Sequence, residues 1–226
     1  MRVVSWNIRD LSGDPLAVQA VLRHLAPDVL CLQEAPRRPG SALRIGALAR
    51  STGLRHVVGG RGSGGTALLV GPAVTAGSAR AVRFPVAHWY TRTRGAVLAR
   101  LRTPSLELAV ACVHLPLGPA DRVDHAHRVL AELDAARSVA GGSLPTVIAG
   151  DLNEPPGAPA WEAFAGLVGD PAPHAGPTFP ARRPGGRIDA VLVSEQVRVL
   201  GYGDGGAPEN LVHRASDHWP VLAVLG

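Results

Sequence analysis

Short apolar runs that end in polar residues recur along the chain. The run at residues 147–149 continues through a glycine into Asp151 and Asn153. It is too short for a membrane-spanning or free-standing helix, so it predicts a buried strand that presents polar side chains at its end. Alternate side chains of a strand share a face, and Asp151 and Asn153 are therefore expected to address one ligand together. Pro155 and Pro156 then end the strand, because proline cannot donate to a sheet.

The same pattern predicts strands and helices in mixed order along the rest of the chain. Further strands are expected at residues 2–5, 29–32, 55–58, 66–70, 79–84, 95–101, 106–114, 187–193, 197–201 and 221–225. Helices are expected from Pro15, with Asp14 as N-cap, to just before Pro27, and at residues 41–51, 121–139 and 159–167.

Three of these elements carry more specific expectations. The helix at 41–51 is expected to turn Leu43, Ala47 and Leu48 inward, and the strand at 197–201 to form a hairpin with 187–193. The glycine-rich linker at residues 59–65 is either a mobile lip over a site or a plain hairpin loop.

Length and composition favour one domain over residues 1–226. The chain has 46% hydrophobic residues and no stretch typical of a linker, which is enough for a substantial core. No apolar run approaches the roughly 18 residues of a membrane helix, and the N-terminus lacks the apolar segment of a secretory signal. We therefore expect a soluble cytoplasmic monomer. Cys31 and Cys112 lie in apolar runs and are expected to be buried rather than to form a disulfide or a metal pair.

The charge of the chain points only weakly to nucleic acid. The formal net charge is +5, and all 23 basic residues are arginine. Phosphate binding needs clustered cations, but these arginines are scattered apart from a few pairs such as Arg37/Arg38 and Arg182/Arg183. For each pair a solvated surface is the preferred interpretation.

Polar residues at separate strand boundaries form the candidate site: Asn7, Glu34, His114, Asp151 with Asn153, and Asp217 with His218. Active sites are commonly built this way, from loops that a rigid sheet positions. Glu34, Asn7 and Asp217 offer the oxygen ligands that Mg²⁺ or Mn²⁺ prefers. Asp151 and His218 could act as acid or base, and Asn153 and His114 could donate to phosphate oxygens. The chemistry that they could share is phosphoester hydrolysis.

The motifs that contain these residues resemble those of the endonuclease/exonuclease/phosphatase superfamily, which includes pancreatic deoxyribonuclease and the AP endonucleases. The matching segments are Ser5-Trp6-Asn7-Ile8, Leu32-Gln33-Glu34, Val113-His114-Leu115, Gly150-Asp151-Leu152-Asn153, Arg187-Ile188-Asp189 and Ser216-Asp217-His218-Trp219-Pro220. They span the chain in the family's order.

The resemblance implies a four-layer α/β/β/α sandwich of two mixed sheets with outer helices. It also implies Asn7 and Glu34 as ligands of Mg²⁺ (or Mn²⁺) with Asp217 nearby, and Asp151 and Asn153 at the phosphate and the attacking water. His218 would be the general base or acid with Asp189 orienting its ring, and His114 would be a second donor to the phosphate. From the sequence, no acidic partner of His114 can be identified.

Departures from the family patterns narrow the function. AP endonucleases have an acid two residues after the first asparagine, where this chain has Arg9, and inositol-polyphosphate phosphatases have a tryptophan-cysteine pair where it has Arg187-Ile188. A nuclease that hydrolyses phosphodiester bonds is therefore the preferred prediction. A phosphatase or phosphodiesterase on small-molecule or lipid phosphoesters, and a non-catalytic binding module of the same fold, stay open. Thr178, Arg182 and Arg183, in the loop at 170–186, are expected to line the substrate groove rather than the core.

Overall fold

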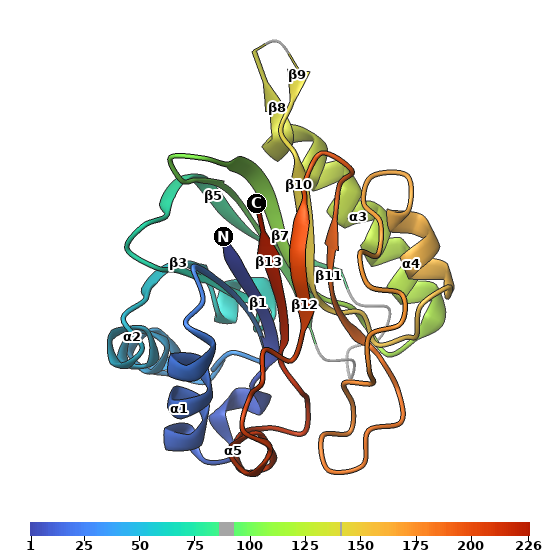
Figure 1. The fold of residues 1–226 in the computed structure, drawn as a ribbon. Coiled ribbons are helices and arrows are strands. Elements are labelled where there is room, and N and C mark those ends of the chain that lie inside the picture. The colour runs from blue at the N-terminus through green and yellow to red at the C-terminus, as the bar shows by residue number, and fades with distance from the viewer. Residues whose placement is uncertain (86–92, 141) are drawn as a thin grey trace.

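Two mixed β-sheets form the centre of the protein, as a computed structural model shows for residues 1–85, 93–140 and 142–226 (Figure 1). In spatial order, the six-stranded sheet contains β12 (Val199–Gly203), β13 (Val221–Leu225), β1 (Arg2–Asn7), β2 (Val29–Gln33), β4 (Ala67–Val70) and β3 (Arg55–Gly59). The five-stranded sheet contains β11 (Asp189–Val193), β10 (Thr146–Asp151), β7 (Glu107–His114), β6 (Arg94–Arg102) and β5 (Thr75–Phe84). Each sheet has one parallel pair, β1 with β2 and β7 with β10.

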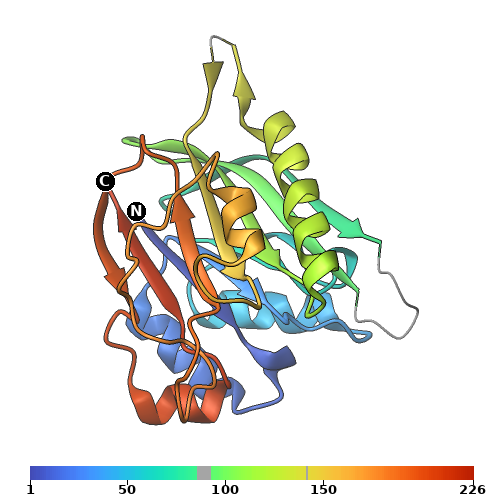
Figure 2. The same ribbon diagram turned by 90° about the vertical axis from the view of Figure 1, so that its right-hand side faces the viewer.

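Helices cover the outer face of each sheet, which completes four layers and confirms the expected sandwich. On the six-stranded sheet lie α1 (Pro15–Leu25), α2 (Ser41–Ser51) and α5 (Glu209–Ala215). On the five-stranded sheet lie α3 (Pro119–Arg137) and α4 (Pro159–Phe164), side by side (Figure 2). A short pair of strands, β8 (Ser138–Val139) and β9 (Gly142–Ser143), projects beyond the end of α3. Among the described residues, no helix has the length and hydrophobicity to cross a membrane.

The core between the sheets explains where the polar strand ends point. In β1, Val3 faces the other sheet, whereas Val4 and Trp6 face the helices. Because side chains alternate along a strand, Asn7 shares the inter-sheet face with Val3. The same alternation places Asp151 on the face of Val147 and Ala149 in β10. The polar residues therefore lie on the inward faces of the strands, just past the end of the apolar core.

A glycine is required where two of these strands approach each other. A Cβ atom added to Gly150 of β10 would lie 2.1 Å from the carbonyl oxygen of Val113 in β7. No larger side chain fits there without a shift of the backbone. The glycine thus lets the ends of β7 and β10, which carry His114 and Asp151, lie next to each other.

Several boundaries and faces differ from the sequence predictions. β12 pairs with β13 in the six-stranded sheet, so the predicted hairpin between residues 187–193 and 197–201 is wrong. In α2 the buried face is Ile45, Leu48 and Ala49; Leu43 is 78% exposed and Ala47 is also exposed, so their inward placement is wrong. α3 ends at Arg137, because residues 138–139 form β8. The linker at 59–65 joins the antiparallel strands β3 and β4 as a hairpin loop with a short 3-10 turn.

Candidate active site

Asp151 lies at the centre of the candidate site, at the end of β10 opposite to the β8–β9 projection (Figure 1). The ladder of the five-stranded sheet places His114 of β7 and Asp189 of β11 directly beside it, in register on either side. Asp151 is 1% exposed, so its carboxylate depends on protein partners rather than on water.

Both oxygens of the Asp151 carboxylate have partners. Asn7 Nδ2 donates to Oδ2 at 3.1 Å, and His114 Nε2 lies 3.3 Å from the same atom. The backbone N–H of Asn153 donates to Oδ1 at 3.0 Å. Asp151 is therefore the acidic partner of His114 that could not be found in the sequence.

His218 joins this group from the six-stranded sheet. Its Nδ1 lies 2.9 Å from Asp189 Oδ2, and its Nε2 lies 3.9 Å from Asp151 Oδ2. The backbone around His218 is held by Trp6, whose indole Nε1 donates to the His218 carbonyl at 2.9 Å, and by Ser216, whose Oγ accepts from the His218 N–H. The predicted contact between Asp189 and His218 is thus present; its catalytic role stays a prediction.

Burial and neighbouring charges shift the pKa values of two of these groups. Burial raises the pKa of Asp151 to about 7, and the nearby Asp189 carboxylate adds to the rise. For His218, burial opposes the charged form, but the hydrogen bond to Asp189 and the charges of Asp189, Asp151 and Asp217 together outweigh burial and raise the pKa of the imidazole to about 9. Asp151 can therefore exchange a proton near neutral pH, while His218 is held as an imidazolium.

Two predicted site residues have left-handed backbone conformations. Asn153 has a φ of 54° and Glu34 a φ of 48°. Residues other than glycine seldom adopt this left-handed backbone region. At Asn153 the conformation is supported by its side chain, whose Nδ2 donates to the Leu115 carbonyl at 2.8 Å. Such strain at the end of a strand is typical of functional positions.

Two of the predicted metal ligands lie at or directly after the ends of neighbouring strands of the six-stranded sheet. Asn7 and Gln33 are in register at the ends of β1 and β2, and Glu34 follows directly. Because Asn7 Nδ2 donates to Asp151, its Oδ1, which accepts from the Arg9 N–H, is the atom that could bind a cation. The Asp217 carboxylate is 42% exposed and lies 3.7 Å from Arg9 Nε. This set of amide and carboxylate oxygens fits Mg²⁺ or Mn²⁺ by its chemistry.

A second group of possible ligands lies deeper. Among the described residues, ligand atoms of Asp151, Asp189 and His218 all lie within 4.8 Å of one another. Two of these side chains are already hydrogen-bonded to each other, and an imidazolium would repel a cation. The inner group is therefore better suited to hold and transfer a proton than to bind a metal.

The loop at 170–186 does not match its prediction in full. Thr178 is buried, and its Oγ1 accepts from the backbone N–H groups of Ile188 and Asp189, so it supports β11. It also lines a surface cavity together with Arg187 and Trp219. Arg182 and Arg183 are exposed, and Arg182 donates to the His213 carbonyl.

Sequence reasoning also missed Phe179, which follows Thr178. Its ring lies 4.7 Å from that of His218, centroid to centroid. No periodicity marks residues of such a loop.

A comparison with protein families identifies the class to which this fold belongs. The sequence profile of the Endonuclease/Exonuclease/phosphatase family matches residues 4–218, and the chain therefore belongs to this family. Its members are hydrolases that act on phosphoesters and generally depend on a divalent metal. A comparison with curated protein sequences gives no match.

Solved structures of several enzymes resemble the whole chain. A mannosyl-6-phosphatase from Bacteroides thetaiotaomicron has a TM-score of 0.81 at 19% identity, with 100% of this chain and 99% of that chain covered. ANGEL2, a 2′,3′-cyclic phosphatase in complex with adenosine-2′,3′-vanadate, has a TM-score of 0.76 at 19% identity, with coverage of 98% and 94%. TDP2 of D. rerio, complexed with a single-strand DNA product, has a TM-score of 0.76 at 16% identity, with coverage of 100% and 98%. At these identities the likeness establishes the fold.

Proposed function

We propose that this protein is a divalent-metal-dependent phosphodiesterase that hydrolyses nucleic acid. The main support is the buried Asp151 carboxylate, which contacts Asn7 and His114 and lies beside the Asp189–His218 pair. A fold-supporting role alone would not gather these acids and imidazoles, because burying charges costs free energy. Buried groups with shifted pKa values cluster at functional sites.

In the proposed reaction, Asp151 takes a proton from the attacking water. Its position between donors and its raised pKa suit a general base near neutral pH. The metal, held by Asn7 and Glu34 with Asp217 nearby, would neutralise charge on the phosphate and polarise the P–O bond.

His218, kept positive by Asp189, then faces the charge that develops on the phosphate oxygens and can give its Nε2 proton to the leaving oxygen. Asn153 and His114 are the proposed donors to the remaining phosphate oxygens. His114 Nε2 contacts Asp151 and Asn153 Nδ2 donates to the Leu115 carbonyl, so both side chains would reorient to bind a phosphate.

The choice of nucleic acid as substrate has two supports. The chain carries a net charge of +5, and Arg182 and Arg183 are exposed on the loop whose Thr178 supports Asp189. TDP2, which resembles the chain over its whole length, was solved with a DNA product.

A second candidate is a phosphatase for small molecules. It is favoured by the likeness to the mannosyl-6-phosphatase. The alignment covers all of this chain and 99% of the phosphatase, so this chain has no large additional segment, such as one for binding a nucleic-acid duplex, that the phosphatase lacks.

One substrate screen separates the candidates. Purified protein with Mg²⁺ or Mn²⁺ would be incubated with plasmid, single-stranded DNA, RNA, bis-p-nitrophenyl phosphate and p-nitrophenyl phosphate. Hydrolysis of nucleic acid and of the diester supports the nuclease. Turnover of the monoester alone supports the small-molecule phosphatase, and no turnover with either metal contradicts both.

A further inference from the structure

Two buried charged side chains lie next to the candidate site without a part in the proposed reaction. Arg122, in the first turn of α3, is 7% exposed, and Glu154, directly after Asn153, is 5% exposed. Arg122 Nε donates to Glu154 Oε2 at 2.7 Å. Replacing a buried ion pair by apolar residues is often neutral or stabilising, so the presence of this pair calls for a reason other than stability.

Arg122 also holds the loop that follows His114. Its Nη1 donates to the carbonyl oxygens of Pro116 at 3.0 Å and Leu117 at 2.8 Å. One guanidinium therefore binds two successive carbonyls on one side and a carboxylate on the other. A lysine could not make these contacts at once, because its single nitrogen cannot span the three acceptors in the fixed geometry of a planar fork.

Glu154 holds the other loop in a similar way. Its Oε1 accepts from the backbone N–H of Ala160 in the first turn of α4, and its carbonyl accepts from Trp161 Nε1 at 2.9 Å. Since α4 has no side-chain cap at its N-terminal residue Ala158, the Glu154 carboxylate binds a backbone donor that the helix leaves open.

Between the ion pair and the site, the two loops are joined directly. Leu115 N–H donates to the Asp151 carbonyl at 2.9 Å, and Asn153 Nδ2 donates to the Leu115 carbonyl at 2.8 Å. His114 thus stands just before the residues that Arg122 holds, Pro116 and Leu117. Asn153 stands just before Glu154. When Asn153 Nδ2 turns to a phosphate, the Leu115–Asp151 backbone bond and the Arg122–Glu154 pair still connect the two loops. The distance between the two proposed phosphate donors therefore depends on these two connections.

We propose that Arg122 and Glu154 are positioning residues that set the separation of His114 and Asn153 for phosphate binding. The inference rests on the proposed function. The alternative is that the pair only fastens α3 to α4, which lie side by side in Figure 2.

The test uses Glu154→Gln and Arg122→Lys, which change the contacts with little change of volume. In the glutamine variant one terminal atom is a donor, so Arg122 Nε and Ala160 N–H cannot both keep an acceptor. With the diester that the wild type hydrolyses, kcat of each folded variant is expected to fall on the order of 10- to 100-fold, the effect of small misplacements in a site. Melting temperatures establish that each assay is done on folded protein.

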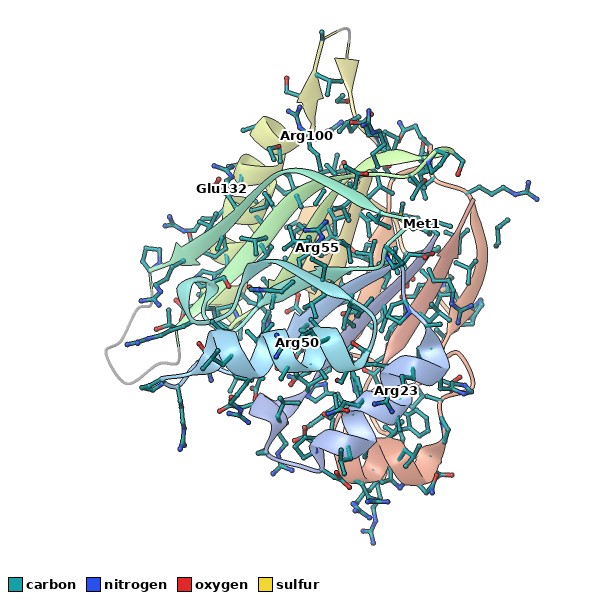
Figure 3. The ribbon with its side chains drawn as sticks, turned by 90° about the vertical axis from the view of Figure 1, so that its left-hand side faces the viewer. Met1, Arg23, Arg50, Arg55, Arg100 and Glu132 are labelled. Carbon is teal, nitrogen blue, oxygen red and sulfur yellow. The ribbon has the colours of Figure 1, made fainter. Side chains whose placement is uncertain are left out.

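A matched control is Arg100→Ala. Arg100 also donates from its guanidinium to backbone carbonyls, those of Ala136 and Ser138, but at the other end of α3 (Figure 3). The Arg100→Ala substitution should lower the melting temperature and leave kcat within about twofold of the wild type. A similar result for the Glu154 and Arg122 variants, a lower melting temperature with kcat within about twofold, overturns the inference.

Guanidinium rescue and a spectroscopic readout complete the test. In Arg122→Ala, millimolar guanidinium should restore part of kcat over an equal concentration of NaCl if the site lacks a positioned guanidinium. At this concentration guanidinium does not denature the protein, so a variant that is only destabilised would show no gain over NaCl. The imidazole nitrogen resonances of His114, assigned with His114→Gln, should shift in Glu154→Gln and not in Arg100→Ala. Wild-type protein inactive on every substrate contradicts the proposed function, whereas unshifted His114 resonances contradict the positioning role.

Discussion

Asp151 combines deep burial with a carboxylate that is surrounded by donors. Asn7 and Asn153 donate to it and His114 lies 3.3 Å away, which would suit an ionised form, yet burial and Asp189 raise its pKa to about 7. A carboxylate that is poised between two protonation states is expected at a position that transfers a proton, and is unusual where a residue only stabilises the fold.

We therefore predict that Asp151→Asn lowers kcat by about 10²- to 10⁴-fold, the usual range for loss of a general base. The amide has a single acceptor oxygen, so it can keep the hydrogen bond from Asn7 or the one from Asn153 but not both. This loss opposes the gain from removing a buried charge, so the melting temperature should change little. Steady-state kinetics and thermal unfolding measure the two quantities. An Asp151→Asn protein with wild-type kcat would exclude the role of base.

Asp189 and His218 are expected to act as one unit, since the carboxylate lies 2.9 Å from the ring nitrogen and holds the imidazole positive. Asp189→Asn should cost nearly as much rate as His218→Ala, and the double variant should be little worse than the worse single variant. A kinetic cycle over the three variants, with melting temperatures alongside, tests this. Additive rate losses would show that the residues act separately.

Glu34 is the residue on which we expect metal dependence to rest. EDTA should abolish activity, and Glu34→Gln should sharply raise the Mg²⁺ concentration needed for half-maximal rate, because a neutral amide binds a divalent cation more weakly than a carboxylate. A titration of rate against Mg²⁺ measures the shift. Undiminished activity in EDTA would refute metal dependence as a whole.

At the scale of elements, the sequence predicted correctly those features that depend only on neighbouring residues, such as the start of a helix. Asp14 and Pro15 predict the start of α1, and Asp14 Oδ1 does accept from the backbone N–H groups of Leu16 and Ala17. The inward face of α2 was wrong at Leu43 and Ala47 because its apolar residues are compatible with more than one face, and packing on the six-stranded sheet selects Ile45 and Leu48.

The features that the sequence did not predict depend on contacts between residues far apart in the chain. Whether β12 joins β11 or β13 depends on contacts that no local pattern encodes, and the same holds for the contact of His114 with Asp151, which arises from the register of β7 against β10. Arg122 and Glu154 were missed for a similar reason, since each looks like an ordinary surface charge until α3 and the loop after β10 come together. The strand-end residues were predictable because chemistry, order and spacing pointed to them at once.

The loop between α4 and β11 leads to a prediction on substrate size. Arg182 and Arg183 are exposed, whereas Thr178 and Phe179 of the same loop contact the backbone at Asp189 and the ring of His218. Replacing both arginines with alanine should weaken binding of DNA or RNA and reduce its salt dependence. Turnover of bis-p-nitrophenyl phosphate should stay nearly unchanged. Equal losses on both substrates would indicate that the arginines support the fold instead.

At the scale of the whole molecule, the site depends on the docking of one sheet on the other. Asn7 and His218 belong to the six-stranded side, and His114, Asp151 and Asp189 to the five-stranded side. The apolar core between the sheets, which includes Leu101 and Val110, holds the two groups at their working distance.

Two cavity variants test this dependence. Leu101→Ala removes volume between the sheets, and Leu133→Ala removes it between α3 and the five-stranded sheet; both leucines are fully buried. Each should lower the free energy of unfolding by about 2–5 kcal/mol. We expect kcat at 25 °C to fall in Leu101→Ala and to stay near wild type in Leu133→Ala. Equal kcat values in the two variants would contradict the dependence on sheet docking.

The continuity of the site with the inter-sheet core has a consequence for redesign. Asp151 and its neighbours end strands whose other inward side chains are core residues, so a larger side chain at any of these positions would require repacking of the interior. The loop at 170–186 divides differently: Thr178 and Phe179 are tied to Asp189 and His218, but residues 171–176 make no such contact among the described residues. Replacing the segment at 171–176 should therefore leave the hydrolytic centre unchanged.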